Sequence, residues 1–465
     1  MAPKFGTSGL RGLVTELTDD LVSDHIHAFI AACPTGGAVH IGEDLRPSSP
    51  NIADAVEAAV TAAGLTAIRH GALPTPALAL ASMTAGQAAV MITGSHIPAD
   101  RNGLKFYVPK GEISKEDEAA ITAALGQPAP TKDGATDHQT TALPVYVDRY
   151  VSAFGTGALS GLKIGVYQHS SVARDVMVEV LTALGAAPVA LAHSDVFIPV
   201  DTEAVDPETQ TMLADWAHAH GLDAILSTDG DGDRPMVAGP DGAIIPGDIL
   251  GPLTAQFLGA DQLITPVSSN SLIDDMDCFA SCQRTRIGSP FVIAGMETAL
   301  SHDPNAKVAG YEANGGFLLG YTATGPAGPL PPLMTRDSLL PMLAPLVAAQ
   351  AQGLTLSALA ATLPACFTAA GRVQNIPTDK SSALIEDLTA DSTARAAFFE
   401  GVGEEKAVDL TDGLRVSFAG GAVVHLRPSG NAPECRCYVE HSDPKVAKSL
   451  VEAHLAKLAD QLAGQ

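Results

Sequence analysis

The chain of 465 residues is long enough for about three or four domains of roughly 100–200 residues each. Apolar residues make up 46% of it and aromatic residues only 5%, so Ala, Leu and Val must fill most of the interior. Lys and Arg (27) against Asp and Glu (52) give a net charge of −25, which argues against nucleic acid or an anionic membrane surface as the main partner. A pocket for an anionic small molecule, built from a few Arg and Lys, stays open.

Several features bear on location and membrane contact. The N-terminal segment lacks the apolar stretch of a secretory signal peptide. The six cysteines form no Cys-x-x-Cys pair, so we expect no structural zinc site and predict a cytoplasmic protein with reduced thiols. Residues 71–95 and 338–371 carry no charge, but proline and glutamine interrupt both stretches. A spanning helix needs about 20 mainly apolar residues, so we expect buried elements here and no membrane span.

The first half of the chain repeats one pattern, in which an amphipathic helix ends at glycine and a short apolar strand follows. The helices, glycines and strands are predicted at residues 52–63, Gly64 and 66–68; at 176–184, Gly185 and 188–191; and at 212–220, Gly221 and 224–226. Glycine after a helix favours a left-handed stop, and helices alternating with apolar strands indicate α/β layers with largely parallel pairing. We therefore predict related α/β units in series.

The last hundred residues have a different pattern. Apolar residues alternate over residues 414–418, Gly420-Gly421 is typical of a hairpin turn, and residues 423–426 and 435–439 are further predicted strands. Pro444 then opens a helix. The sequence thus predicts a separate C-terminal α+β domain.

Breaks near residues 127–136, Gly247 and residues 364–377 suggest the domain limits. We predict three related α/β domains with mixed sheets, followed by the α+β domain. The predicted limits are residues 1–143, 144–247, 248–366 and 367–465.

Ser95 follows an apolar strand predicted at residues 88–92, which places it at the carboxyl end of a sheet, where α/β proteins bind ligands. Gly94 removes side-chain bulk beside the hydroxyl, and His96 and Lys105 supply polar or cationic groups. A serine hydroxyl needs a base or an electrostatic field to act as a nucleophile. An ordinary polar turn is the alternative, and the Gly-x-Ser-x-Gly pattern of serine hydrolases is absent here.

Asp229, Asp231 and Asp233 alternate with glycines directly after a predicted strand. Glycine lets the backbone turn tightly, so that three carboxylates can converge on one hard cation, and an all-oxygen site favours Mg²⁺. An EF-hand does not fit, because Arg234 stands where that loop requires glycine. The alternative is a solvated acidic turn, in which the three carboxylates repel one another.

Three further loops carry polar groups. Glu312 and Asn314, in a glycine-rich loop, suit hydroxyl recognition, although a plain turn is equally consistent. Residues 427–433 with Arg436 have the composition of a phosphate cradle, or form a turn between two strands. Arg11 either presents one cation to a site or lies in a flexible N-terminal loop.

Together these loops resemble those of a known family. In chain order the segments FGTSGLRG, TGSHIPADRNGLKF, DGDGDR, YEANGG and RPSGNAPECR look like the motifs of the α-D-phosphohexomutases, which include phosphomannomutases and phosphoglucomutases. The resemblance extends from Phe5 to Val439 and implies four domains around a central cleft.

The resemblance also implies a role for residues in each loop. Ser95 is implied as a phosphoserine, which would bind Mg²⁺ together with Asp229, Asp231 and Asp233. The groups implied to line the reacting phosphate are Arg11, His96, Lys105 and Arg234. The groups implied to bind the substrate are Glu312 and Asn314 at the sugar, and Arg427, Ser429, Gly430, Asn431 and Arg436 at the non-reacting phosphate.

The chain departs from the family pattern at three positions. The sugar loop of the family commonly reads Gly-Glu-x-Ser-Gly-His, whereas this chain has Asn314 in place of the serine and Gly316 in place of the histidine. In the phosphate loop Asn431 stands where threonine is common, a change that keeps hydrogen bonding. The first two changes bear on the choice of sugar.

We therefore predict an enzyme that interconverts hexose 1-phosphate and hexose 6-phosphate, with mannose first and glucose second as the sugar. The resemblance implies a phosphoserine and a bound hexose 1,6-bisphosphate intermediate, which is also the activator. Phosphoglucosamine mutase, a metal-dependent sugar phosphatase and a non-catalytic sugar-phosphate-binding protein stay open as alternatives. The predicted partner is a small sugar phosphate, and the sequence does not indicate an oligomeric state.

Overall fold

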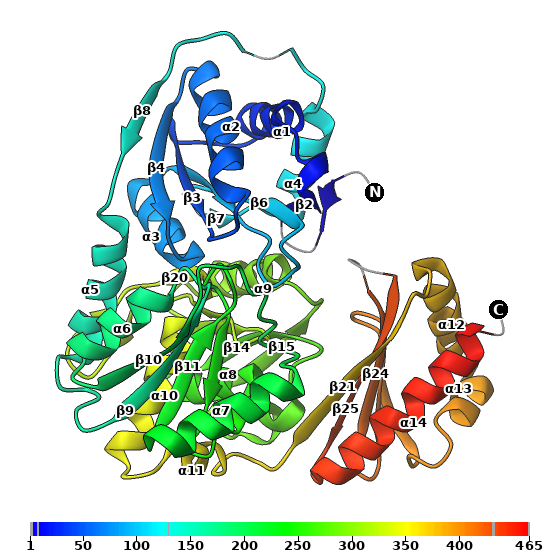
Figure 1. Cartoon of the computed structure of the whole chain (residues 1–465). Helices are drawn as coiled ribbons and strands as arrows, with labels where there is room; N and C mark the ends of the chain where they lie inside the picture. Colours follow the sequence, from blue (N-terminus) through cyan, green and yellow to red (C-terminus); the bar gives the residue numbers. More distant parts are fainter. Residues whose placement is uncertain (1–2, 7–8, 129, 430–432, 464–465) are drawn as a thin grey trace.

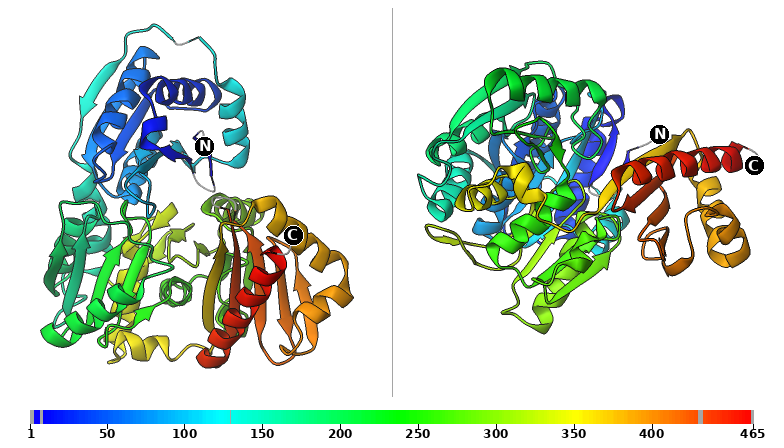
Figure 2. Two further views of the ribbon diagram at one scale, coloured as in Figure 1. Left: turned by 45° about the vertical axis from the view of Figure 1, so that its right-hand side comes forward. Right: turned by 90° about the horizontal axis from the view of Figure 1, so that it is seen from below.

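The computed structural model describes every residue except 1–2, 7–8, 129, 430–432 and 464–465. Three α/β domains and a C-terminal α+β domain follow one another along the chain, as predicted (Figure 1). The first domain lies above the second and third in that view, and the fourth stands beside the third. Seen from below, the fourth domain projects from the side of the other three (Figure 2).

The first domain is built on a mixed sheet with the strand order β1-β2-β6-β5-β3-β4-β8, with β7 paired to β6. The pairs of β3 with β4 and with β5 are parallel, and β5 pairs antiparallel with β6. Its strands are β1 (Lys4–Phe5), β2 (Leu10–Leu13), β3 (Ala38–Glu43), β4 (Thr66–Ala72), β5 (Ala88–Ile92), β6 (Arg101–Val108), β7 (Gly111–Glu112) and β8 (Ala135–His138). Its helices are α1 (Asp19–Ala32), α2 (Ser49–Ala62), α3 (Thr75–Ala85) and α4 (Lys115–Ala124), with a short 3₁₀ helix η1 (Val14–Glu16).

The second domain has the strand order β10-β9-β11-β12-β13, in which the first three strands are parallel. Local sequence signals set its helix ends: Asp206 accepts the N–H of Thr209 ahead of α7, and Gly221 ends that helix with φ +59°. Its strands are β9 (Lys163–His169), β10 (Ala187–His193), β11 (Ala224–Thr228), β12 (Pro235–Ala238) and β13 (Ile244–Ile245). Its helices are α5 (Ala142–Phe154), α6 (Arg174–Ala183) and α7 (Pro207–His220).

The third domain has the strand order β15-β14-β16-β17-β20, and β18 and β19 form a separate small pair. Its strands are β14 (Gln262–Pro266), β15 (Ser281–Thr285), β16 (Val308–Tyr311), β17 (Phe317–Leu319), β18 (Ala323–Thr324), β19 (Pro329–Leu330) and β20 (Leu333–Asp337). Its helices are α8 (Gly247–Leu258), α9 (Ser289–His302), α10 (Leu339–Ala351) and α11 (Leu356–Ala360), with a 3₁₀ helix η2 (Ser271–Asp275).

The fourth domain is an antiparallel sheet, β21-β25-β24-β23-β22, with helices packed against it (Figure 1). Its strands are β21 (Phe367–Gln374), β22 (Glu405–Asp409), β23 (Leu414–Phe418), β24 (Val423–Pro428) and β25 (Glu434–His441). Its helices are α12 (Thr378–Ala390), α13 (Ser392–Phe398) and α14 (Pro444–Ala463). Most of residues 364–377, expected to be a break, is strand β21, because β25 supplies it with a complete antiparallel partner that the local sequence does not reveal.

The first uncharged stretch is mostly buried, whereas the second is buried mainly in its first half. Residues 71–95 contain α3 and β5, and β5 is fully buried. Residues 338–371 contain the largely buried α10 together with α11. Among the described residues, no helix is both long enough and apolar enough to cross a membrane.

Candidate active site

Ser95 lies in the loop between β5 and β6 and is completely buried. Its backbone is in the left-handed region, with φ +55°, which is uncommon for a residue with a side chain. Thr93 holds this conformation, because its Oγ1 accepts the Ser95 N–H at 2.8 Å. The Ser95 Oγ donates to Asp229 Oδ2 at 2.5 Å and lies 3.3 Å from His96 Nδ1. The loop thus presents the hydroxyl to the aspartate loop of the second domain.

Arg46 supports this loop, although it stands in no recognisable sequence motif. Its guanidinium donates to four loop carbonyls, those of Ser95, Ile97, Pro98 and Arg101, at distances of 2.6–3.1 Å. A Cβ on Gly94 would come within 2.8 Å of this guanidinium, so the glycine is needed for the close approach. The only sequence signal for Arg46 is its position after β3, at the same sheet edge as Ser95.

The three aspartates occupy the tight turn between β11 and β12, and all three are completely buried. Asp229 shapes the turn, because its Oδ1 accepts the N–H groups of Asp233 and Arg234 at 3.2 and 3.3 Å. One carboxylate oxygen from each aspartate lies within 4.8 Å of the others. The predicted convergence of the three carboxylates is confirmed.

Lys105, from β6 of the first domain, reaches into this cluster. Its Nζ donates to Asp231 Oδ2 at 2.5 Å and to Asp233 Oδ2 at 2.6 Å. Burial, and after it the charges of Asp231 and Asp233, raise the pKa of Asp229 well above its ordinary range. Burial acts in the same direction on Asp231, but Lys105, Thr75 and Arg336 together outweigh it, and the pKa of Asp231 is lowered. The cluster therefore needs positive charge to keep its carboxylates ionised.

The aspartate loop has the donor atoms that a hard divalent cation requires. Within the part of the chain that the structure describes, Asp231 Oδ1 and Asp233 Oδ1 are buried oxygens without a hydrogen-bond partner. A buried carboxylate oxygen left without a partner is costly, and a cation among these oxygens removes that cost. The three-aspartate group can therefore hold a metal ion, and its oxygen ligands fit Mg²⁺.

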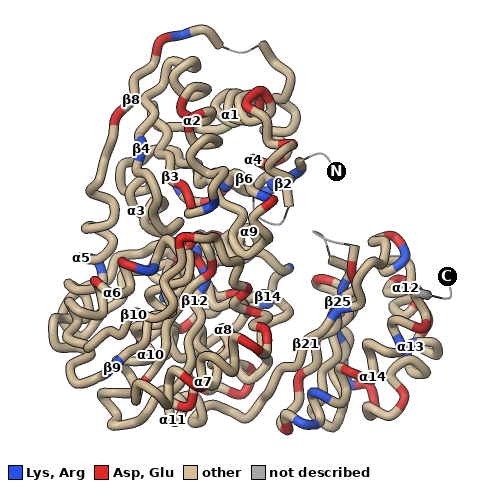
Figure 3. Tube along the Cα trace, in the orientation of Figure 1, with Lys and Arg blue, Asp and Glu red and all other residues tan. Residues whose placement is uncertain are grey.

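The other predicted groups at the reacting phosphate lie around the same point. Arg234 NH1 lies 3.2 Å from His96 Nδ1. Burial, and then the charge of Arg234, lower the pKa of His96 to about 3, so the imidazole is neutral near pH 7. Burial, and then Arg234, also lower the pKa of Arg11 on β2 to about 10, which leaves Arg11 cationic at that pH. Figure 3 shows this gathering of opposite charges where the first domain meets the second and third.

The sugar-loop candidates lie between β16 and β17 and are buried. Asn314 Oδ1 accepts the N–H of Gly316 at 3.0 Å, so this oxygen shapes the loop itself. Glu312 Oε2 lies 3.5 Å from NH1 of Arg336. Arg336, on β20, was not identified from the sequence, because it stands in no recognisable motif.

The phosphate-loop candidates lie in the fourth domain, where they contact acids of that domain. Arg427 Nε donates to Asp412 at 2.9 Å, and Arg436 NH2 lies 2.8 Å from Glu434. Ser429 is buried and donates its backbone N–H to the carbonyl of Glu434. Gly430 and Asn431, also predicted for this loop, lie outside the described residues.

A pocket of about 650 Å³ lies between the second, third and fourth domains. Ala313 of the sugar loop and Tyr438 of β25 both line it. Glu203 and Asp248 also line it. A residue of the sugar loop and a strand residue of the fourth domain therefore line the same pocket.

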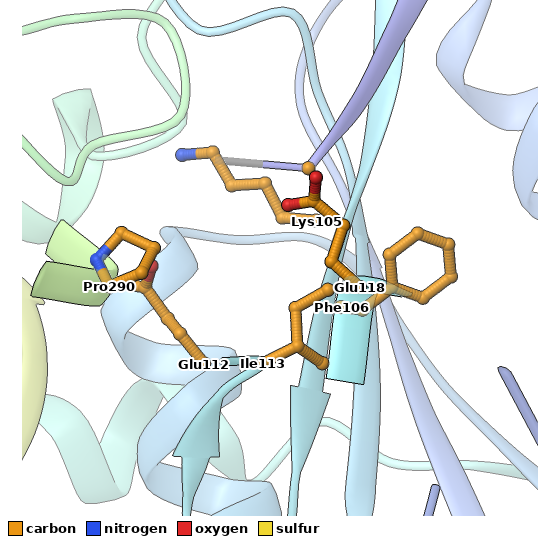
Figure 4. Close-up of a pocket in the computed structure, with 7 residues that line it drawn as sticks. Lys105, Phe106, Glu112, Ile113, Glu118 and Pro290 are labelled. Atoms are coloured by element: carbon orange, nitrogen blue, oxygen red, sulfur yellow. The ribbon is translucent and has the colours of Figure 1, made fainter. Parts of the chain in front are cut away.

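A much smaller cavity lies beside Lys105 (Figure 4). Glu112 and Glu118 of the first domain and Pro290 of α9 also line it. Its volume of about 10 Å³ is room for about one water molecule, so it belongs to the packing between domains.

Comparison with known families assigns each domain. Models of the phosphoglucomutase/phosphomannomutase family match alpha/beta/alpha domain I at residues 2–130, domain II at 144–242, domain III at 246–367 and the C-terminal domain at 379–457. The chain belongs to this family. The resemblance found in the sequence is confirmed.

Full-length relatives agree with this membership. The chain is 44% identical to a phosphomannomutase of Sinorhizobium fredii over 98% of its own length and 99% of the relative's, and 42% identical to a phosphomannomutase of Salmonella muenchen over 98% and 96%. A crystal structure of a phosphoglucomutase/phosphomannomutase family protein from Burkholderia thailandensis superposes with a TM-score of 0.76 at 21% identity, covering 98% of this chain and 97% of that one. The likeness to this structure extends over all four domains.

Proposed function

We propose that this enzyme of the phosphoglucomutase/phosphomannomutase family interconverts hexose 1-phosphate and hexose 6-phosphate, with mannose as the preferred sugar and glucose as a second one. One observation carries the proposal: the buried Ser95 Oγ lies 2.5 Å from Asp229 Oδ2, inside a group of three carboxylates and their cations. The preference for mannose rests on the names of the two relatives with 44% and 42% identity.

In the proposed reaction, Ser95 carries a phosphoryl group that passes to the free hydroxyl of the bound sugar monophosphate. The bond from phosphorus to Ser95 Oγ breaks and a bond to the sugar oxygen forms. The sugar hydroxyl gives up one proton and the Ser95 oxygen takes up one, so no proton is gained or lost overall. The bisphosphate then turns over in the cleft, and its other phosphoryl group returns to Ser95. Hexose 1,6-bisphosphate added from outside would act as activator, because it can phosphorylate an unmodified Ser95.

The residues around Ser95 stabilise the charge of the transferring group. Arg11, Lys105 and Arg234 supply basic side chains, and His96 offers a neutral imidazole. Asp229, Asp231 and Asp233, with an oxygen of phospho-Ser95, would hold Mg²⁺. When bound, this ion supplies Lewis-acid stabilisation of the phosphoryl oxygens.

At the other end of the substrate, the proposal assigns the sugar hydroxyls to Glu312 and Asn314. It assigns the non-reacting phosphate to the fourth domain. The residues proposed there are Arg427, Ser429, Gly430, Asn431 and Arg436. Support comes from the shared cleft, which Ala313 and Tyr438 both line.

The domain limits of residues 1–143, 144–247, 248–366 and 367–465 are also part of the proposal. Each limit separates one of the four main sheets from the next. A cytoplasmic location is proposed as well, supported by six cysteines that are all free thiols.

The test is an assay of purified enzyme with Mg²⁺, a trace of hexose 1,6-bisphosphate, and mannose, glucose or glucosamine 1-phosphate. We expect 6-phosphate to form at the highest kcat/KM with mannose, without release of inorganic phosphate. Phosphate released in step with substrate loss would indicate a phosphatase, and no turnover would indicate a binding protein. A preference for glucosamine 1-phosphate would overturn the proposed substrate. Ser95→Ala is the inactive control.

A further inference from the structure

Arg336 connects two loops that the proposed function uses for different purposes. Its NH2 lies 2.9 Å from Asp233 Oδ2 in the metal loop, and its NH1 lies 3.5 Å from Glu312 Oε2 in the sugar loop. The side chain is 3% exposed, so both ion pairs are shielded from water. The contact to Glu312 is an ion pair without a hydrogen bond, and its charges attract each other more strongly than those of a surface pair because water is excluded.

The backbone that carries Arg336 is itself fixed. The neighbouring Asp337 accepts the phenol hydroxyls of Tyr146 and Tyr150, both from α5. Ser338 Oγ donates to the carbonyl of Gly232 at 2.7 Å, which ties the end of β20 directly to the aspartate loop. The guanidinium of Arg336 is therefore held at a set distance from the metal loop.

Gly316 provides the space for this side chain. A Cβ at position 316 would lie 2.8 Å from Cγ and 2.9 Å from Cδ of Arg336, which is too close, so that the arginine side chain would have to move. The histidine that commonly ends this loop in the family is therefore incompatible with Arg336 in its present place. Glycine at position 316 leaves the room that Arg336 of β20 needs to reach the site.

We propose that Arg336 is a positioning residue that orients the carboxylate of Glu312 toward the sugar and occupies the space left by the histidine missing at position 316. Since it also binds Asp233 through Oδ2, it leaves the unpartnered Oδ1 of that residue for the metal. The inference rests on the proposed function, in which Glu312 binds sugar hydroxyls.

Two effects of opposite sign follow from this arrangement. Without the guanidinium, Glu312 loses its fixed orientation, and the affinity for the sugar should fall. The interaction at stake is the hydrogen bond from a sugar hydroxyl to the charged Glu312. Such a bond contributes about 1.5–3 kcal/mol, which corresponds to roughly a 10- to 150-fold change in sugar affinity. Mg²⁺ binding should instead stay the same or tighten, because a cation 2.9 Å from Asp233 repels the metal.

The experiment compares the wild type with Arg336→Met, Arg336→Lys and Gly316→Ala. Affinity for mannose 1-phosphate is measured by calorimetry on dephosphorylated enzyme with chelator, so that neither metal nor turnover contributes. Mg²⁺ affinity is measured separately, from the rise of Tm with added Mg²⁺ and no sugar. The matched control is Arg69→Met, since the Arg69 side chain is 13% exposed and pairs with Glu43, Asp54 and Glu57 in the first domain.

We expect Arg336→Met to weaken sugar binding roughly 10- to 150-fold. Arg336→Lys should weaken it less, because lysine keeps the positive charge but lacks the planar guanidinium that can reach two carboxylates at once. Gly316→Ala should weaken binding in the same direction, because its methyl group displaces Arg336. Arg69→Met should keep the affinity of the wild type even if its Tm falls. Gly316→Ala and Arg336→Lys keep the test decisive if Arg336→Met does not fold.

Sugar affinity within about twofold of the wild type in the Arg336 variants would overturn the inference. So would a large loss of Mg²⁺ affinity with sugar affinity unchanged, because Arg336 would then serve the metal loop alone. Glu312→Gln separates this failure from a failure of the proposed function. If Glu312→Gln also leaves sugar affinity unchanged, then the assignment of the sugar loop is at fault.

Discussion

Lys105 and Arg336 bind aspartates of another domain, whereas Arg427 and Arg436 pair with acids of their own domain. The hydrophobic cores differ in the same way. One continuous core runs from Leu73 of the first domain through the second domain to Leu356 of the third. The core of the fourth domain contains only residues from its own part of the chain, Leu384 to Leu462.

This difference indicates how the enzyme can handle a substrate with two ends. The phosphoryl-transfer half is assembled by packing and ion pairs among three domains, so its geometry is set before substrate arrives. The fourth domain meets the third through a few polar contacts, among them Glu440 to the Ser271 N–H and Asp412 to the Ile287 N–H, both 3.0 Å. A domain held in this way can change its position as the substrate turns around, which fits the proposed reaction.

The largest effect is expected from Asp231→Asn in the preassembled half. The substitution keeps the volume but removes one of three charges proposed to hold Mg²⁺. Loss of one electrostatic group at a reaction centre typically costs about 10²- to 10³-fold in rate, and we expect a loss in kcat/KM at or above the upper value. Steady-state assays across a range of Mg²⁺ concentrations check this. Wild-type kcat/KM at any Mg²⁺ concentration would exclude Asp231 from the metal site.

Arg46→Lys tests whether the Ser95 loop must be held rigidly. Lysine keeps the charge beside Asp44 but cannot reach all four loop carbonyls. A displacement of about 1 Å at a reacting atom can cost roughly 10²-fold, so we expect kcat to fall by about that factor with KM nearly constant. Arg69→Lys is the control. A variant that raises only KM would show that Arg46 acts on substrate binding instead.

Arg427→Ala tests the fourth domain. The guanidinium of Arg427 is expected to bind the phosphate that does not react. We expect KM to rise roughly 10- to 150-fold, the range for one charge-assisted hydrogen bond, while kcat changes little. Substrate titrations with the purified variant measure both constants. If kcat falls and KM is unchanged, then the division between the two halves is wrong.

A last effect concerns stability and pH in the fourth domain. Burial lowers the pKa of His425 from 6.5 to about 4, because its ring is enclosed beside Asp412 and Tyr438. A lowered pKa means that the unfolded chain binds the proton more readily, so the stabilisation is complete above about pH 6.5 and is lost as the pH falls toward 4. The free energy of unfolding should fall by about 3 kcal/mol at most over this pH range.

Denaturant unfolding of wild type and His425→Gln between pH 7 and pH 4 measures this contribution. The wild type should lose stability more steeply than the variant over that interval. Equal slopes would show that His425 does not titrate as its burial indicates.

The parts of the site that the sequence predicted are those encoded within short segments. Asp229, Asp231 and Asp233 converge because glycines and the end of β11 fix a single turn, and Ser95 is placed by the end of β5. Arg46 and Arg336 could not be found in this way. The loop carbonyls that Arg46 binds begin 49 residues along the chain, and Arg336 contacts Asp233 of another domain. Asn314 shows a further limit of prediction from sequence. Its side-chain type suits a sugar hydroxyl, but its Oδ1 accepts a hydrogen bond from the backbone of its own loop.

The central claim is that Ser95 carries the phosphoryl group, and its phosphorylation state tests that claim most directly. Active enzyme should carry one phosphate on the Ser95 peptide, detected by mass spectrometry. Enzyme stripped of that phosphate should be folded but inactive, and hexose 1,6-bisphosphate should restore both the phosphate and the activity, which it should not do for Ser95→Ala. Full activity of the stripped enzyme from the first turnover, with no bisphosphate present, would contradict the account.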